Sequence, residues 1–215
     1  MTRTITRLFD DYADAQTAVT ELERLGIPHD NLSILANNAH GLHGRDGAHR
    51  EGDHDVTDVN EHGDVSRGAS TGAVLGGVGG LLAGLGLLAI PGLGPIVAAG
   101  WLASTAAGAA IGGVGGAATG SLVGALKNAG HSEDEANVYS EGVRRGGTLV
   151  SAKVDDHLVG QAEAVLDGNR GVTAATRGSA YRQAGWNRFD ETAAPYSPEE
   201  IERDRAASRR EPSIL

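Results

Sequence analysis

Two pairs of adjacent aspartates are the residues of this sequence whose type and spacing could do acid–base chemistry. Asp10-Asp11 and Asp155-Asp156 stand at matching places in two similar segments. Paired carboxylates act as acid and base when their surroundings push the two pKa values apart in a cleft. Each pair, however, directly precedes an apolar pattern of helical spacing, and aspartate is a preferred residue at a helix start. We therefore interpret both pairs as helix caps and expect neither catalytic residues nor an enzyme.

Five histidines in one acidic, glycine-rich stretch are the candidate metal ligands. Imidazole and carboxylate groups suit Zn²⁺, Ni²⁺ or Cu²⁺, and such tracts can bind metal weakly without a fold. The glycines around them disfavour a formed site, so we interpret residues 37–66 as a disordered acidic linker and expect no cofactor. The five candidates are His40, His43, His49, His54 and His62.

Composition excludes several classes of protein. The formal net charge of -10 argues against a nucleic-acid binder that neutralises phosphates. The chain has no cysteine, which removes disulfides, thiolate catalysis and thiolate metal sites. The N-terminal residues contain no apolar stretch of signal-peptide length, so we expect the part outside any membrane to lie in the cytoplasm.

An uncharged run from Gly68 to Leu126 carries small residues at every fourth position. Spacing of four lines one face of a helix and leaves a groove of bare backbone for close helix packing. We therefore predict a glycine-zipper helical hairpin over residues 67–128, broken at Ile90–Pro95. The expected helix-packing positions are Gly72, Gly76, Gly80, Gly84, Gly108, Gly112, Gly116, Gly120 and Gly124.

This hairpin favours a membrane, with a soluble oligomer as the alternative. At about 1.5 Å per residue, each arm could cross a hydrocarbon core of about 30 Å. Arg67 and Lys127 flank the run on one side, and Trp101 near the turn is a candidate interface anchor. So many Gly and Ala residues are only marginally hydrophobic, so a hairpin that buries its groove in a homo-oligomer remains open.

The segments around the hairpin predict a small sandwich. Residues 1–36 and 147–178 each read as strand, helix and strand, and two such units give the α+β, ferredoxin-like βαββαβ fold with the hairpin inserted. Residues 129–146 form a connecting helix with Ser132 as its cap. Residues 179–215 form a tail with a short, exposed helix beginning at Ser197-Pro198, and its aromatic residues suggest docking onto the domain, a membrane or a partner.

Several local motifs together resemble one bacterial family. They are Asp10-Asp11, Gly26-Ile27-Pro28, the run from Ala89 to Pro95, Ser132-Glu133-Asp134-Glu135-Ala136, and the run from Tyr139 to Gly147. Over residues 3–177 the chain is similar to the general stress protein 17M-like (heat-induced stress protein, YflT-type) domain. The resemblance implies a stress-linked protein of unassigned molecular function and transfers no catalytic residue.

Two functions follow as expectations. The favoured one is a non-enzymatic general stress-response protein that self-associates through the hairpin at the cytoplasmic membrane, with its folded domain facing the cytoplasm. Membrane lipid and a second copy would then be its partners, and nucleic acid would not. The alternative is a soluble, cytoplasmic, oligomeric binding module that responds to a ligand or a metal.

Overall fold

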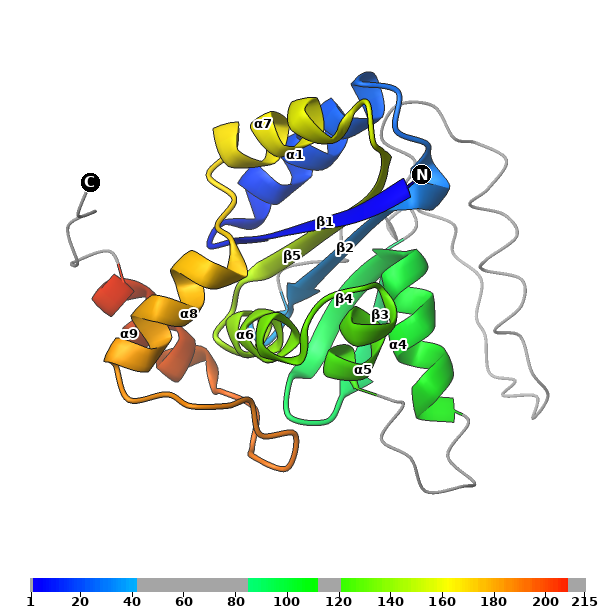
Figure 1. Cartoon of the computed structure of the whole chain (residues 1–215). Coiled ribbons are helices and arrows are strands. Elements are labelled where there is room, and N and C mark those ends of the chain that lie inside the picture. The colour runs from blue at the N-terminus through cyan, green and yellow to red at the C-terminus, as the bar shows by residue number, and fades with distance from the viewer. Residues whose placement is uncertain (1, 42–84, 112–120, 209–215) are drawn as a thin grey trace, which may run out of the picture.

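A five-stranded antiparallel sheet forms the centre of the molecule, in the order β1-β5-β2-β4-β3. The computed structural model describes residues 2–41, 85–111 and 121–208 (Figure 1). The strands are β1 (Thr2–Phe9), β2 (Leu32–Asn37), β3 (Gly86–Ile90), β4 (Gly94–Gly100) and β5 (Thr148–Asp155). The fold class is α+β, as the sequence predicts.

Helices cover both faces of the sheet (Figure 1). On one face, α1 (Tyr12–Arg24) packs beside α7 (Val159–Gly168) over one hydrophobic cluster. A second cluster lies under the helices of the other face, which are α4 (Trp101–Ile111), α5 (Leu122–Asn128) and α6 (Glu133–Arg144). Two further helices, α8 (Ala174–Gln183) and α9 (Pro198–Ser208), lie beyond α6, and a 3-10 turn, η1 (His29–Asn31), precedes β2.

Local signals in the sequence predicted several helices and strands of this α+β domain. Helix α1 follows Asp11 as its N-cap residue, and α6 begins with a complete capping box between Ser132 and Glu135. The expected strands at β1, β2 and β5 are also confirmed. In addition, β5 lies between β1 and β2 and is antiparallel to both, so the first two strands are parallel to each other.

The predicted helical hairpin over residues 67–128 is wrong for residues 86–100, which form β3 and β4. Leu93 N–H donates to Ile90 O, and Gly92 has a φ of +74°, so Pro91-Gly92 makes a tight β-turn between two strands. Residues four apart share a face of a strand as well as of a helix, so the spacing could not separate the two. Glycine weakens a helix, whereas the branched side chains of β4 favour a strand.

The remaining zipper positions divide between two helices and undescribed residues. Gly108 lies in α4 and Gly124 in α5. The positions outside the described residues are Gly72, Gly76, Gly80, Gly84, Gly112, Gly116 and Gly120. Trp101 is no interface anchor at a distant turn, because its Nε1 donates to Asn31 O and Lys153 Nζ lies 4.0 Å from its ring centroid. Within residues 2–41, 85–111 and 121–208, every helix is too short or too polar to cross a bilayer.

The second strand expected in residues 147–178, after helix α7, is replaced by helix α8. Val172 forms one antiparallel bridge with Leu8, and the chain then turns away because the Thr173 side chain accepts from Thr176 N–H and caps α8. Within the described residues, this is the one backbone bridge on the outer edge of β1.

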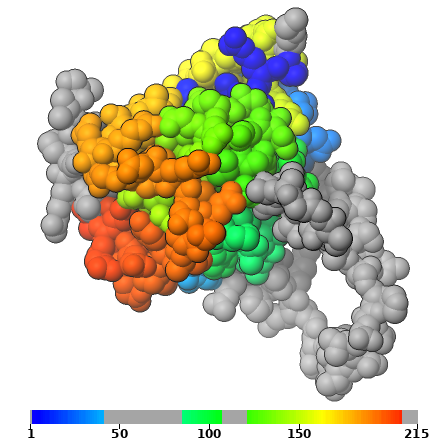
Figure 2. All heavy atoms as spheres, turned by 60° about the horizontal axis from the view of Figure 1, so that its bottom comes forward, coloured from blue at the N-terminus to red at the C-terminus, as the bar shows by residue number. Residues whose placement is uncertain are grey.

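The C-terminal tail docks on the domain, whereas the sequence favoured an exposed helix. Ile201 in α9 is fully buried, and Phe189 is 5% exposed. The guanidinium of Arg144 lies 5.6 Å from the Phe189 ring centroid and 5.0 Å from that of Tyr196. Figure 2 shows the tail, in orange and red, lying against the green and yellow-orange helices.

Gly146 gives a test of this docking. It has a φ of +93°, and a Cβ placed there would collide with Ile201 Cγ2. Gly130 has a φ of +101° with nothing within 4 Å of such a Cβ, so it is a matched control. Alanine at either site costs about 1–2 kcal/mol of unfolding free energy for the left-handed backbone. We expect Gly146→Ala to lose a further ~1–3 kcal/mol in urea unfolding, because α9 is overpacked. Equal losses would show that α9 does not pack on this turn.

Candidate functional site

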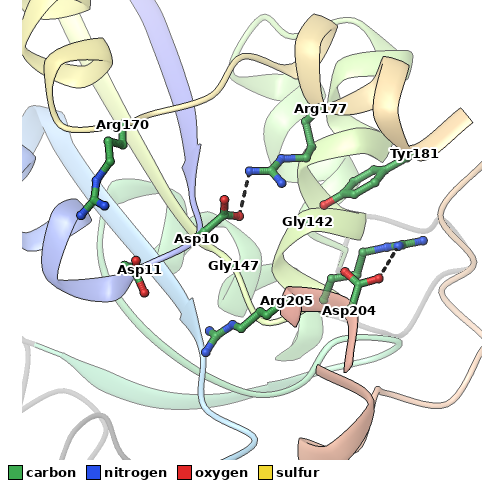
Figure 3. A pocket seen from close by; sticks show the side chains of 10 residues that line it. Asp10, Asp11, Gly142, Gly147, Arg170, Arg177, Tyr181, Asp204 and Arg205 are labelled. Carbon is green, nitrogen blue, oxygen red and sulfur yellow. Dashed lines mark hydrogen bonds and ion pairs between the residues drawn. The ribbon is translucent and has the colours of Figure 1, made fainter. Parts of the chain in front are cut away.

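A cavity of about 200 Å³ opens where β1 ends and β5 begins, between α6, α8 and α9. Four arginines and three aspartates give it an unusually charged lining (Figure 3). The lining residues are Asp10, Asp11, Gly142, Arg145, Gly147, Arg170, Arg177, Tyr181, Asp204 and Arg205. The cavity is large enough for several waters, each of which takes about 30 Å³ in the liquid.

Separate parts of the fold deliver these side chains. Asp10 and Asp11 come from the turn between β1 and α1. Arg145 ends α6, and Gly147 follows it in the turn into β5. Residues 177 and 181 lie one turn apart on α8 and therefore share a face of that helix. The site forms only when α8 and α9 are packed against α6.

Arg177 lines the cavity, and its guanidinium group makes a hydrogen bond to another lining residue. Its Nη2 donates to Asp10 Oδ1 at 2.8 Å, an interaction that Figure 3 shows as a dashed line. Its Nε is buried and has no hydrogen-bond partner among the described residues. A guanidinium carries five N–H donors, and Asp10 engages one of them in Arg177.

Arg145 is fixed by carboxylates on two sides. Its Nε donates to Glu141 Oε1 at 2.8 Å, and its Nη1 donates to Asp204 Oδ1 at 2.8 Å. Its guanidinium also lies 4.4 Å from the ring centroid of Tyr181. Burial lowers the pKa of Arg145, but the hydrogen bond to Glu141 and the charge of Asp204 raise it above the ordinary value. Arg145 is therefore a permanent, oriented cation in the cavity wall.

Two further arginines complete the lining. Arg205 Nη2 donates to Gly146 O at 2.7 Å, which fastens α9 to the turn after α6. Arg170 Nη2 donates to Asp14 Oδ1 at 2.6 Å, and Arg170 has a φ of +67°, the only positive φ of a non-glycine residue in the described part of the chain. Strained backbone of this kind is concentrated at functional sites.

The chemistry of the lining suits binding of an oxyanion. Guanidinium groups recognise phosphate and carboxylate through paired N–H donors. Two of the three lining aspartates, Asp204 and Asp10, each pair with an arginine of the lining. The lining set includes no Ser, Thr, Cys, Lys or His.

A second polar cluster lies beside the edge of β1. His131 Nε2 is 2.8 Å from Thr6 Oγ1, which is 2.9 Å from Ser151 Oγ. The Tyr139 hydroxyl donates to Thr6 O at 2.8 Å, and burial raises the pKa of Tyr139 to about 12. His131 Nδ1 is 3.9 Å from Glu135 Oε2, too far for a hydrogen bond, and Thr6 is 2% exposed. We therefore interpret this cluster as structural and not as a catalytic triad.

Of the two aspartate pairs singled out in the sequence, one contains the N-cap residue of a helix and the other does not. Asp11 is the N-cap residue of α1 but makes no side-chain cap hydrogen bond, and Asp10 faces Arg177. Asp155-Asp156 does not cap α7, because the N-cap residue of that helix is Leu158. Asp156 instead lies 3.9 Å from Arg3 Nε.

Of the five candidate metal ligands, the structure describes one. His40 Nε2 lies 3.5 Å from Glu202 Oε1 of α9. His43, His49, His54 and His62 lie outside the described residues. Among the residues that are described, no group of three or more His, Asp or Glu side chains could hold a metal ion.

The arginines of the cavity were missed by sequence reasoning. They are single residues between positions 145 and 205, with no common spacing. One signal was available, because Asp10-Asp11 and the run from Tyr139 to Gly147 both belong to the motifs of the family resemblance, and both line this cavity.

Glu141 allows a test of the buried ion pairs that hold Arg145 in the lining of the cavity. Its carboxylate is fully buried and pairs with Arg144 and Arg145. Removing one member of a buried pair typically costs about 3–5 kcal/mol, so we expect Glu141→Ala to lower the unfolding free energy by that amount in urea titrations. Glu133 lies on the surface of the same helix, α6, and pairs with Lys127 of α5. Glu133→Ala should therefore cost at most about 1 kcal/mol, and a similar loss in both variants would contradict the role of Glu141.

His131 predicts a pH dependence of stability. Burial lowers its pKa, and the charge of Glu135 only partly opposes this. The unfolded chain therefore binds a proton at a higher pH than the folded chain, and the stability contributed by neutral His131 is lost as the pH falls below about 6.5. We expect His131→Gln, which cannot titrate, to lose less stability than the parent between pH 7 and pH 5. Parallel pH profiles in urea unfolding would rule out this linkage.

Comparison with protein family models, with curated proteins and with solved structures finds no match to this chain. The function is therefore argued from the site itself.

Proposed function

We propose that this chain is a non-enzymatic, stress-linked binding protein whose arginine-lined cavity holds a small molecule with a phosphate or carboxylate group. The single observation that carries the proposal is the presence of four arginines in the lining of one cavity of about 200 Å³. The motifs that resemble the general stress protein 17M-like domain support the stress-linked part, since two of them contribute to the cavity wall.

The electrostatics favour an anion although aspartates are present. Asp10 and Asp204 each lie 2.8 Å from an arginine nitrogen, so their charges are compensated within the protein. Arg177 spends one N–H on Asp10 and keeps a buried Nε without a partner among the described residues. The other N–H donors of its guanidinium group are the groups that would receive an oxyanion.

The finer description of the fold belongs to the same proposal. The order β1-β5-β2 is the arrangement of a split βαβ unit, which supports a ferredoxin-like βαββαβ ancestry for these strands with α1 and α7. The bridge between Leu8 and Val172 lies where the fourth strand of that sandwich would run. In this reading, β3 and β4 extend the sheet on its other side.

We prefer ligand binding to a membrane-crossing hairpin because part of the uncharged run forms strands β3 and β4 of the folded domain. A hairpin that crosses a bilayer needs residues 86–100 in its helices or in its far turn. Here β4 pairs with β2 inside the sheet, and Ile96 and Val97 are buried in the domain. These contacts support a role for this part of the run in the folded core.

Thermal unfolding in inorganic phosphate tests the proposal. A ligand at a hundredfold excess over its dissociation constant stabilises by about 2.7 kcal/mol, which is roughly 5–11 °C in the midpoint of a domain of this size. We expect a rise of that order in saturating phosphate and no such rise in chloride of equal ionic strength. Arg177→Gln should abolish the rise, measured from its own baseline without phosphate.

Arg182 provides the matched control on the same helix. It is exposed, pairs with Asp134 and does not line the cavity, so Arg182→Gln should keep the full phosphate effect. Succinate in place of phosphate separates carboxylate from phosphate recognition. The same midpoint in phosphate and chloride, or an undiminished rise in Arg177→Gln, would sink the proposal.

A further inference from the structure

The two edges of the sheet differ sharply in chemical character. The edge strand β1 carries Arg3 and Arg7 and is closed at one end by the bridge from Leu8 to Val172. The edge strand β3 has the sequence Gly-Leu-Leu-Ala-Ile, without a charge or a proline. Proteins usually protect an exposed edge with lysine, proline or a bulge, because unpaired backbone groups recruit another strand. By this criterion, and counting only the residues that the structure describes, β1 is protected and β3 is not.

Leu87 is the most informative residue of the unprotected edge. It is 68% exposed, and it is the one large hydrophobic side chain that lies exposed in the described part of the chain. Its neighbours in β3 behave differently, because Ile90 is buried and Leu88 packs against the core of the α6 face. Side chains alternate along a strand, so Leu87 and Ala89 share the opposite, outward face. Ala89 is exposed as well.

The described strands at this edge carry no charge. Strand β3 and its neighbour β4 are both apolar in sequence, although Glu191 lies against Gly92 in the turn that joins them. A charged peptide would therefore find no complementary side chain on β3 itself. A second copy of β3 matches it in being neutral and apolar, and two antiparallel strands can exchange backbone N–H···O=C hydrogen bonds.

We propose that a second copy of this chain pairs antiparallel along β3, so that two five-stranded sheets join into one. Antiparallel pairing of two identical strands closes about a two-fold axis, which ends the assembly at a dimer and leaves no further edge of this kind. In that arrangement the leucine and alanine side chains of the outward face lie opposite those of the other copy, and Leu87 leaves water. This interface is independent of the arginine-lined cavity.

Sedimentation equilibrium over a range of protein concentrations gives the first test. We expect a monomer–dimer equilibrium that Leu87→Lys weakens by on the order of a hundredfold, because two copies each lose a buried leucine. Since Leu87 is exposed in one copy, lysine can be accommodated without unfolding, and circular dichroism checks this. Ala89→Lys on the same face should act in the same direction. Thr4→Lys on β1 is the matched control and should leave dimerisation unchanged.

Single cysteines give the second test, since the chain has none of its own. Cysteine is placed in turn at each position of β3 from 86 to 90, and disulfide formation between copies is measured after mild oxidation. A two-fold antiparallel pair brings only the residue at the axis next to its own copy, so we expect one position to cross-link far more than the others.

Four results would overturn the proposal. They are a monomer at every concentration, a dimer that survives Leu87→Lys, a dimer that Thr4→Lys dissociates, and equal cross-linking at all five positions. Flotation of a monomeric chain with neutral phosphatidylcholine vesicles, lost in Leu87→Lys, would also overturn it and assign the edge to lipid.

Discussion

The buried carboxylate of Glu141 is the interaction on which the C-terminal half of the structure depends. It is completely inaccessible to water, and both Arg144 and Arg145 pair with it. A lone buried carboxylate is strongly unfavourable, so these two guanidinium groups must stay in place for the domain to fold. Glu141 contacts each guanidinium group from the buried side. The opposite side of each group can therefore contact other parts of the chain.

Each of the two arginines holds a different part of the tail. Arg144 faces the rings of Phe189 and Tyr196, and Arg145 joins Tyr181 of α8 to Asp204 of α9. The arginine-lined cavity lies beside this junction, so the same contacts that dock the tail also build the candidate binding site. Burial raises the pKa of Tyr181, which keeps its hydroxyl neutral beside these charges.

Sequence patterns predicted the elements whose signals are local. Ser132 as a cap predicted the start of α6, and the strand, helix and strand pattern of residues 1–36 and 147–178 predicted β1 and β5. The predicted helical hairpin was wrong because its pattern fits two structures. Small residues four apart share a face of a strand as well as of a helix, and residues 86–100 form strands. The prediction was also wrong at Thr173, where a side-chain cap started a helix in place of a strand.

The cavity could not be predicted in the same way. Its residues range from Asp10 to Arg205, and only the packing of α8 and α9 on α6 brings them together. Its four arginines, at positions 145, 170, 177 and 205, have no period or spacing that marks them as a site. The acidic net charge even pointed away from anion binding, because charge summed over the chain says little about a cavity lined by a few side chains.

The most direct measurement of the central claim is an amide NMR titration of the whole chain with inorganic phosphate. The account predicts shifts that saturate with one midpoint and are confined to residues around Gly142, Gly147 and Arg177. Shifts that never saturate and that concentrate at exposed cations such as Lys127 and Arg188, with none in the cavity, would contradict it.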